Sequence, residues 1–442
     1  MTSRNFKILH VAESDINGGA ARAAFRVHEC LLDKNYSQDN SFSSYMRVIN
    51  KFSNNDSVKG GIPNNNKFRY FCQKALNYFS RSIYTSSNKN TFSTAWPSTG
   101  LGNELNKLYL GKKIDIVTLH WLGNHCLSVK EIGNLKMPVT WRLADQWAFC
   151  GCEHYDEDFA NQVRDQDELM YINGYKSKIK KSFDLNKINF SLKKKYWKKP
   201  ITIIAPSKWI AKCAQKSDLF KNFPVSVIPT PLNLSKWAPI DRNFAREVLQ
   251  LPQEKKLLLF GAVDAVSNTR KGGDLLIEAI KSLERNNYGI DRENIELVIF
   301  GQNKIPKNFD VNLRVHNAGF IDNDIVLRLY YSACDVFIIP SRQDNLPGTG
   351  LEAHACGTPV VGFNIGGIPE IIDHHVTGAI VKSFDAKSLS EEIAWVIKDE
   401  LRLDYLSKAA RSRAVELWNK EKISRMYFNL YLDVINRKQS NI

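Results

Sequence analysis

Two acidic residues, Asp344 and Glu352, are separated by seven residues that include two glycines. The apolar run over residues 336–339 predicts a strand before them, and residues 348–351 predict a turn that opens a helix. Free N–H groups at a helix N-terminus bind anions, and glycine lets a phosphate approach the main chain. A nearby carboxylate can accept hydrogen bonds from sugar hydroxyl groups. The segment therefore suits a sugar joined to a diphosphate, although a simple strand–helix turn with an acid favoured by the helix dipole fits the same spacing.

The second half of the chain alternates apolar runs with amphipathic segments. Strands are expected at residues 256–261, 295–301, 336–340 and 359–363, and helices at residues 272–285, 325–333, 351–356 and 388–398. This alternation predicts a parallel sheet with helices on both faces. Ligands of such sheets bind beyond the carboxyl ends of the strands, and Asp344 directly follows one of these strands.

The first half opens with the same kind of unit. A strand over residues 6–12 is followed by a turn with Gly18 and Gly19 and by a helix over residues 20–32. Further strands are expected at residues 114–120, 138–143, 201–206 and 225–229, while residues 50–100 are expected to be mostly loop with one helix near residues 67–83. We therefore expect an α/β chain of two doubly wound domains with a ligand cleft between them. The domains would span residues 1–230 and 231–415, and residues 416–442 would form a C-terminal helix that crosses back to the first.

Composition narrows the possible classes of protein. The 442 residues carry a net charge of +15 and are 43% hydrophobic, which is typical of a folded chain with anionic partners. No signal peptide and no membrane-spanning run is expected. Cys150, Cys152 and His154 lack a second pair at zinc-site spacing, so we expect reduced thiols and no bound metal. These features favour a cytoplasmic protein.

Residues 344–370 resemble the signature of the retaining family-4 glycosyltransferases. In that family two acids with seven residues between them precede an Ala-Cys-Gly-Thr-Pro-Val-Val run and a Gly-Gly-x-Pro-Glu turn, and this chain has the two runs at residues 355–361 and 366–370. The resemblance implies the GT-B fold, in which two Rossmann-like domains face each other across a cleft. It also implies transfer of a sugar from a nucleotide diphosphate donor, with retention of configuration and without a metal ion or another cofactor.

The resemblance implies roles for residues at matching positions. Glu352 would bind the ribose hydroxyl groups, and Asp344 would contact the donor sugar with a side chain one methylene shorter than the glutamate usual in the family. Lys271, helped by Arg270, would neutralise the leaving diphosphate in catalysis, although both also fit a solvated basic loop. The amides that would hold the sugar and the pyrophosphate belong to Gly348, Thr349, Gly350 and Leu351.

Further segments complete the implied donor pocket. Gly261 ends the strand before the Lys271 loop, and Ala262 stands where the family usually has an arginine. The nucleotide would be enclosed by Gly301, Gln302, Phe320 and Ile321.

The first half resembles bacterial glycosyltransferases of the exopolysaccharide and colanic-acid type. Gly18 and Gly19 would form the loop that approaches the diphosphate and the acceptor. Residues 141–155 match a motif of that subgroup, which would make Asp145 catalytic and place His154 on the acceptor side. Ala144 replaces the histidine that the family has before this aspartate, and His154 by itself also fits a packed or surface histidine.

Residues 175–199 form a strongly basic run with ten lysines and one acid, interspersed with aromatic residues. A solvated charged face explains the run, but lysines and aromatic rings also suit an anionic membrane surface, with about 1 kcal/mol for each basic residue near the lipid. No recognised nucleic-acid-binding module accompanies the run, so nucleic acid is not an expected partner. We therefore expect the protein to lie peripherally on the inner face of the plasma membrane.

The combined expectation is an enzyme that moves a sugar from a nucleotide-sugar donor onto a glycan or lipid-linked acceptor of a cell-surface polysaccharide. Two alternatives stay open. One is a sugar-nucleotide epimerase of the same fold. The other is a catalytically weakened binding subunit, which Ala144, Ala262 and Asp344 would explain.

Overall fold

The computed structural model describes residues 4–32, 40–62, 92–123, 126–155, 184–261, 268–286, 288–306 and 309–439, together with a few positions between 68 and 79 and residue 263. The chain divides into two compact units: Met1–Pro231 with Glu421–Ile442, and Leu232–Lys420. Each unit is built on its own parallel sheet. In the described part of the chain, no helix is long and apolar enough to cross a membrane.

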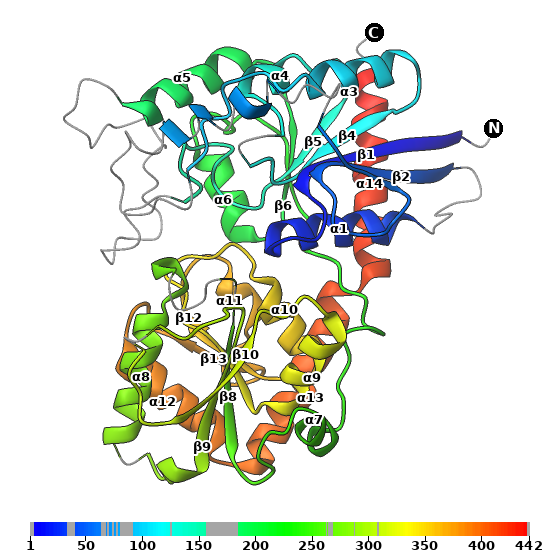
Figure 1. Ribbon diagram of the computed structural model, residues 1–442. Coiled ribbons are helices and arrows are strands. Elements are labelled where there is room, and N and C mark those ends of the chain that lie inside the picture. Colours follow the sequence, from blue (N-terminus) through cyan, green and yellow to red (C-terminus); the bar gives the residue numbers. More distant parts are fainter. Residues whose placement is uncertain are drawn as a thin grey trace. The chain divides into compact units, whose positions relative to one another are not determined.

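Seven parallel strands form the sheet of the first unit, in the order β3-β2-β1-β4-β5-β6-β7 (Figure 1). They are β1 (Arg4–Ser14), β2 (Asn40–Asn50), β3 (Val58–Lys59), β4 (Ile116–Leu119), β5 (Val139–Arg142), β6 (Thr202–Ala205) and β7 (Val225–Val227). All residues of β4 and β6 are buried. Such short, wholly buried strands are expected in a parallel sheet that is covered on both faces.

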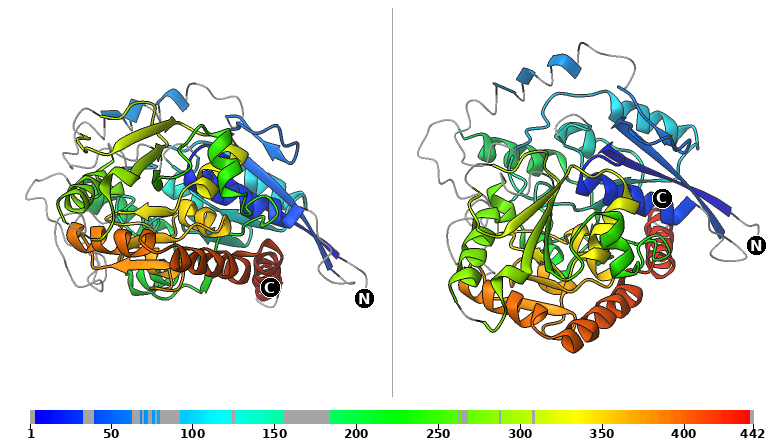
Figure 2. Two further views of the ribbon diagram at one scale, coloured as in Figure 1. Left: turned by 90° about the horizontal axis from the view of Figure 1, so that it is seen from below. Right: turned by 60° about the horizontal axis from the view of Figure 1, so that its bottom comes forward.

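Helices cover both faces of this sheet. They are α1 (Gly19–Leu32), α3 (Leu101–Leu110), α4 (Val129–Gly133), α5 (Leu185–Tyr196), α6 (Lys208–Lys216) and α14 (Lys420–Gln439). Residues of α1 and α14 share one core with β1 and β4, whereas α3 to α6 belong to a separate core on the other face. The C-terminal helix α14 thus packs beside the first strands of the chain, as Figures 1 and 2 show. The Tyr431 hydroxyl group lies 2.8 Å from the Thr118 hydroxyl group of β4.

Six parallel strands form the sheet of the second unit, in the order β10-β9-β8-β11-β12-β13. They are β8 (Lys256–Gly261), β9 (Ile295–Phe300), β10 (Arg314–Gly319), β11 (Val336–Ile339), β12 (Val360–Phe363) and β13 (Gly378–Val381). The helices are α7 (Arg242–Val248), α8 (Gly273–Arg285), α9 (Asp324–Ala333), α10 (Gly348–Ala355), α11 (Ile368–Ile371), α12 (Ala386–Ile397) and α13 (Glu400–Trp418). Helices α8 and α12 pack together beside one face, and α9, α10 and α13 lie beside the other (Figure 1).

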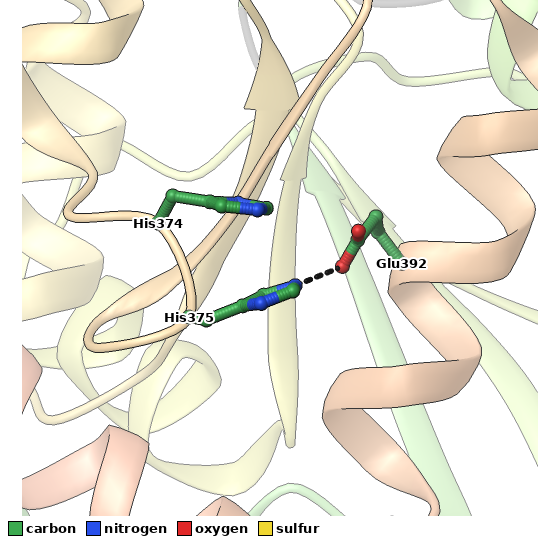
Figure 3. A group of neighbouring side chains, drawn as sticks. All are labelled: His374, His375 and Glu392. Atoms are coloured by element: carbon green, nitrogen blue, oxygen red, sulfur yellow. Dashed lines mark hydrogen bonds and ion pairs between the residues drawn. The ribbon is translucent and has the colours of Figure 1, made fainter.

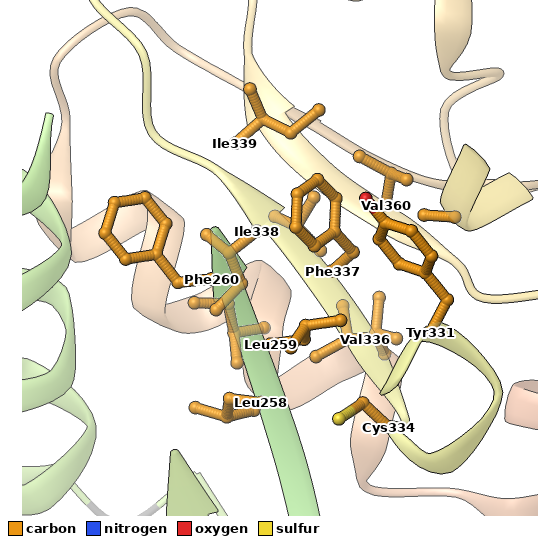
Figure 4. Close-up of a cluster of buried hydrophobic side chains, with 14 of the residues drawn as sticks. Leu258, Leu259, Phe260, Tyr331, Cys334, Val336, Phe337, Ile338, Ile339 and Val360 are labelled. Atoms are coloured by element: carbon orange, nitrogen blue, oxygen red, sulfur yellow. The ribbon is translucent and has the colours of Figure 1, made fainter. Parts of the chain in front are cut away.

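The core of the second unit fixes the central strands β8 and β11. Leu259 of β8 lies beside Phe337 of β11, and Tyr331 of α9 packs against Phe337 on the same face of the sheet (Figure 4). The rings of Tyr331 and Phe337 meet edge to face with centroids 5.6 Å apart. Burial of each large apolar side chain contributes roughly 1.5–3 kcal/mol. The well-packed core around β8 and β11 therefore fixes the positions from which the loops after these strands begin.

The predicted α/β class with two doubly wound parallel sheets is confirmed. Several elements were not predicted, namely the strands β2, β3, β10 and β13 and the helices α3, α4, α5, α7, α11 and α13. Serines interrupt the apolar pattern of β2, and it is held as a strand by pairing with β1 along its length. Helix α10 begins at Gly348, three residues before the expected start at residue 351. The helix expected near residues 67–83 falls mostly outside the described residues.

Candidate functional site

The candidate site lies at the carboxyl edge of the second sheet. β8 ends at Gly261, β9 at Phe300 and β11 at Ile339. Because the strands are parallel, the segments that follow them leave the sheet at the same edge. The structure therefore brings the loop with Lys271 and the loop with Asp344 to one place.

Two cations share one carboxylate at this edge. Lys271 Nζ lies 2.6 Å from Asp344 Oδ2, and Arg270 Nη1 lies 3.4 Å from the same oxygen. Arg270 Nη1 also donates to the backbone carbonyl of Gln343 at 2.9 Å. The three charged side chains are between 10% and 17% exposed. Two positive charges against one negative charge leave a net charge of +1 in a partly water-excluded place, which favours an anionic ligand.

The charges of this cluster also shift its protonation equilibria. Burial by itself would raise the pKa of Asp344, but Lys271 and Arg270 outweigh that effect and hold the pKa of the carboxyl below its ordinary value. Burial lowers the pKa of Lys271, and the charge of Asp344 opposes that shift. Each partner of the pair therefore favours the charged form of the other.

Two glycines allow the loops to approach closely enough for this contact. Gly272 follows Lys271 with a φ of +72°, and a Cβ atom there would lie 1.8 Å from the carbonyl oxygen of Pro340. Gly366 has a φ of +61°, and its Cβ atom would lie 2.2 Å from the carbonyl oxygen of Asp344. The amide of Gly367 donates to that same carbonyl at 3.0 Å. Any larger residue at either glycine would push these loops apart.

Helix α10 starts beside the cluster and has no side-chain cap at its N-terminus. Its N-cap position is Pro347, which makes no side-chain hydrogen bond to the helix. The amides of Gly348 and Thr349 lie in the first turn, where no residue four positions earlier can accept their hydrogen bonds within the helix. They provide N–H donors and the positive end of the helix dipole next to Lys271 and Arg270.

Glu352 lies one turn further along α10 and is 5% exposed. The hydroxyl group of Tyr331, on α9, donates to Glu352 Oε2 at 2.9 Å. Sequence reasoning did not find this contact, because Tyr331 reads as an apolar core residue of its helix. The bond fixes one carboxylate oxygen of Glu352.

The remaining predicted donor residues lie along the same half of the sheet. The amide of Gly301 donates to the carbonyl of Gly319 at 2.7 Å, so the ends of β9 and β10 are tied together. Gln302 is buried, whereas Phe320 is 52% exposed. Ile321 packs against the core of the unit. Ala262 lies outside the described residues.

The first unit holds a second polar group at the carboxyl edge of its own sheet. His154 Nδ1 lies 2.6 Å from Asp145 Oδ2, and the indole N–H of Trp121 donates to the same oxygen at 2.9 Å. Gly18 and Gly19 follow β1 and open α1. Among the described residues, no hydrogen bond joins this glycine turn to Asp145 or His154.

One lysine of the basic run lies in the core and not on the surface. Lys193 of α5 is fully buried, and its amine donates to the carbonyls of Cys150 at 3.0 Å, Gly151 at 2.8 Å and Trp147. Burial lowers the pKa of Lys193 to about 8. This lysine therefore holds the segment around Asp145 in place, and only the other described lysines of the run can form a charged face. Residues 175–183 lie outside the described part.

A separate group of possible metal ligands lies at the opposite edge of the second sheet. His374, His375 and Glu392 place ligand atoms within 4.8 Å of one another (Figure 3). The backbone N–H of Ile380 donates to His374 Nδ1 at 3.0 Å, which places the ring proton of the neutral imidazole on Nε2. That ring then has no lone pair for a metal ion. Because both histidines precede β13, the group is also remote from Asp344, and we assign no metal to it.

Comparison with known sequences identifies the second unit. Residues 241–413 match the family model described as "Glycosyl transferases group 1". An uncharacterized glycosyltransferase of Methanocaldococcus jannaschii is 30% identical over 196 residues, which cover 43% of this chain and 47% of the relative. A D-inositol 3-phosphate glycosyltransferase of Saccharomonospora viridis is 30% identical over 204 residues, covering 43% and 46%. The match thus spans about half the length of these relatives.

Solved structures extend the likeness to nearly the whole chain. Sucrose-phosphate synthase of Thermosynechococcus elongatus is 14% identical and superposes with a TM-score of 0.64, covering 98% of this chain and 100% of that one. Alr3699/HepE of Anabaena is 14% identical with a TM-score of 0.60, covering 97% and 100%. These likenesses give the fold as GT-B, with two Rossmann-like domains. Residues 241–413 of the second unit are thus similar to the domain of the glycosyl transferases group 1 family.

Proposed function

We propose that the chain is a glycosyltransferase that moves a sugar from a nucleotide diphosphate donor to a growing cell-surface polysaccharide or a lipid-linked oligosaccharide, with retention of configuration. The observation that carries the proposal is the net positive cluster of Lys271, Arg270 and Asp344 beside the uncapped start of α10. It is supported by a protein of like fold, Alr3699/HepE of Anabaena, which was crystallised with UDP and glucose.

In this proposal the second unit binds the donor. Lys271, Arg270 and the amides of Gly348 and Thr349 hold the diphosphate, and Glu352 accepts hydrogen bonds from the ribose hydroxyl groups. Asp344 has two possible roles when the donor binds. Its side chain rotates away from Lys271 and contacts the sugar, or it stays bonded to Lys271 while the phosphate contacts the remaining N–H groups of the lysine. Gly350, Leu351 and the residues after β9 and β10 enclose the rest of the donor.

The chemistry needs stabilisation of a departing anion. As the bond between the anomeric carbon and the phosphate oxygen breaks, its electron pair stays on the diphosphate. The acceptor hydroxyl oxygen forms the new bond to the anomeric carbon, and its proton passes to the departing diphosphate. Fixed cations and helix amides aimed at the growing negative charge lower the barrier, and loss of one such donor costs roughly 100- to 1,000-fold in rate. We propose no metal ion and no other cofactor, because these groups supply the charge that a metal would supply.

The acceptor would bind to the first unit, which also carries the basic run over residues 175–199. We propose that this run attaches the protein to the inner face of the plasma membrane, where lipid-linked acceptors lie. Lys194 and Lys195 in the last turn of α5 are part of the described surface of that run. Nucleic acid is not proposed as a partner.

The test is transfer of label from nucleotide sugars. UDP- and GDP-sugars labelled in the sugar are incubated with the protein and with membranes as the acceptor source, and the lipid and polymer fractions are counted. We expect label in one of these fractions and the free nucleotide in solution. Release of an epimerised nucleotide sugar would identify an epimerase, and tight nucleotide binding without turnover on any acceptor would identify a binding subunit.

A further inference from the structure

We infer that the first unit contains a subsite for one hydroxyl group of an acceptor sugar, with Trp121 as its wall, Asp145 as its hydrogen-bond acceptor, and His154 and Ser93 as positioning residues. The class of ligand rests on the proposed function, whereas the site itself rests on the geometry of the first unit. A small cavity lies where β4 and β5 end, and its lining includes Trp121, Ala144, Asp145 and His154. Its volume of about 10 Å³ fits a single water molecule or hydroxyl group.

A continuous hydrogen-bonded chain runs behind this cavity. Ser93 Oγ lies 2.6 Å from His154 Nε2, and His154 Nδ1 lies 2.6 Å from Asp145 Oδ2. The indole N–H of Trp121 donates to Asp145 Oδ2 at 2.9 Å. Asp145, His154 and Ser93 are each at most 9% exposed. The chain therefore orders four side chains from three separate segments around one carboxylate.

The chemistry of the partners fixes the direction of each hydrogen bond. An ionised carboxylate only accepts, so the proton on His154 sits at Nδ1, and Nε2 is left to accept from the Ser93 hydroxyl group. Asp145 Oδ2 then accepts from His154 and from Trp121, and Oδ1 accepts from the backbone N–H of Trp147 at 3.0 Å. Each carboxylate oxygen can accept about two hydrogen bonds. One acceptor position on Asp145 Oδ1 is thus unused by the described contacts.

The residues that line the cavity favour a neutral ligand with a hydroxyl group over an anion. The Asp145 carboxylate repels phosphate and other anions but accepts a hydrogen bond from a hydroxyl group. Trp121 is partly exposed and offers an apolar face beside that carboxylate. A sugar presents this combination, because its ring C–H groups can pack on the indole while one hydroxyl group reaches Asp145. The rest of the sugar ring would lie outside the cavity.

Ser93 is held in place by its main chain and acts through His154. Its N–H donates to the carbonyl of Cys152 at 2.7 Å, and the indole N–H of Trp147 donates to its carbonyl at 2.8 Å. These two bonds fix the backbone of Ser93, so its hydroxyl group is held where it can orient the imidazole of His154. Sequence reasoning missed Ser93 because it precedes the Asp145 segment by some fifty residues and lies in a segment expected to be loop.

The subsite can be tested by saturation-transfer NMR with a fixed panel of probes, the methyl glycosides of glucose, galactose, mannose and N-acetylglucosamine. We expect at least one glycoside to receive saturation from the wild-type protein. Trp121→Ala and Asp145→Asn should each weaken this binding about tenfold, as expected when a stacking ring or a charged acceptor is removed. Ser93→Ala should weaken binding and Ser93→Thr, which keeps the hydroxyl group, should restore it.

The matched control is Trp96→Phe, which removes an indole N–H bonded to Asn189 at 2.8 Å in the same unit but outside the cavity lining. Glycoside binding should survive this change. The inference is overturned if no glycoside binds the wild-type protein, or if Trp121→Ala and Trp96→Phe behave alike. Nucleotide-sugar binding measured on the same samples keeps the two proposals separate, because it depends on Glu352 and Lys271 of the second unit and should be unchanged in every variant of the first.

Discussion

Lys271 and Arg270 share the single carboxylate of Asp344, and this imbalance of charge is what the second unit offers to a ligand. A buried ion pair contributes little net stability by itself, because the attraction only offsets the loss of hydration. Its removal is costly when one charge is left behind. At the scale of single residues, the cluster therefore makes separate predictions for stability and for turnover.

Lys271→Met should lower the free energy of unfolding by about 2 kcal/mol, less than for a fully orphaned buried charge because Arg270 remains near Asp344. Turnover should fall roughly 100-fold through loss of a cation at the departing diphosphate. Urea unfolding and the label-transfer assay measure the two effects. The control is Lys281→Met in α8, an exposed pair with Asp310 that should cost less than about 1 kcal/mol. Wild-type turnover in Lys271→Met would mean that the cation is misassigned.

Asp344 predicts a dependence of stability on pH. Its pKa in the folded protein is below the ordinary value of 3.8, so ionised Asp344 stabilises the fold above that value. The contribution is lost as the pH falls through the lower pKa of the folded state. Asp344→Asn should therefore be less stable than the wild type at pH 7, and the difference should shrink below about pH 4. Urea midpoints measured from pH 7 to pH 2.5 would refute this if the difference stayed constant.

The helix α10 brings to the cluster amides that have no partner within the helix, and its start at Gly348 matters more than its composition. Only the first turn of a helix offers N–H groups without partners in the same helix. Because the turn follows Pro347, which has no side-chain cap, these donors stay available to a ligand. At the scale of elements, the helix terminus and the two loops act as one anion-binding surface.

Gly348→Pro should weaken nucleotide-sugar binding about tenfold while leaving stability nearly unchanged. Proline suits the first position of a helix and removes only the N–H group there. Gly348→Ala keeps that N–H group and serves as the control. Calorimetric titration with a nucleotide sugar gives the affinities, and thermal unfolding reports the stability. Equal affinities for the two variants would show that this amide does not contact the ligand.

Elements with strong local signals could be predicted from the sequence, whereas those held by partners could not. β11 and the Asp344 loop stand out because an apolar run ends in residues that cannot continue a strand. β2 was missed because its serines interrupt the strand pattern, and its pairing with β1 and β3 holds it extended. The Lys271–Asp344 contact joins segments 73 residues apart, so no local pattern reveals it. The hydrogen bond from Tyr331 to Glu352 could not be predicted either, because it also joins residues that are far apart in the sequence.

The whole chain is strongly basic, with a net charge of +15, and part of that charge is concentrated in residues 175–199. Attraction to anionic lipid depends on lysines that reach the surface, each worth about 1 kcal/mol. Lys193 is excluded from this role by its burial in the core. At the scale of the molecule, the charge distribution and not any single contact decides whether the protein binds a membrane.

Exchange of Lys194, Lys195 and Lys198 for glutamate should abolish flotation of the protein with vesicles that contain phosphatidylglycerol. A charge-matched control exchanges Lys387, Lys398 and Lys408 of the second unit for glutamate, and it should still float. Vesicles of phosphatidylcholine alone should bind neither protein. Equal flotation of both triple variants would remove the assignment of the membrane-binding surface to this run.

The most direct test of the account is the affinity of the protein for nucleotide sugars with and without the carboxylate of Glu352. Glu352→Gln keeps the shape of the side chain and an oxygen for the Tyr331 hydroxyl group, so the fold should be retained. Calorimetry with UDP- and GDP-sugars should show binding of one class by the wild-type protein and a 10- to 100-fold loss in the variant, roughly 1.5–3 kcal/mol for hydrogen bonds to a charged group. Unchanged affinity in a folded Glu352→Gln protein, or no binding of either class by the wild type, would contradict the account.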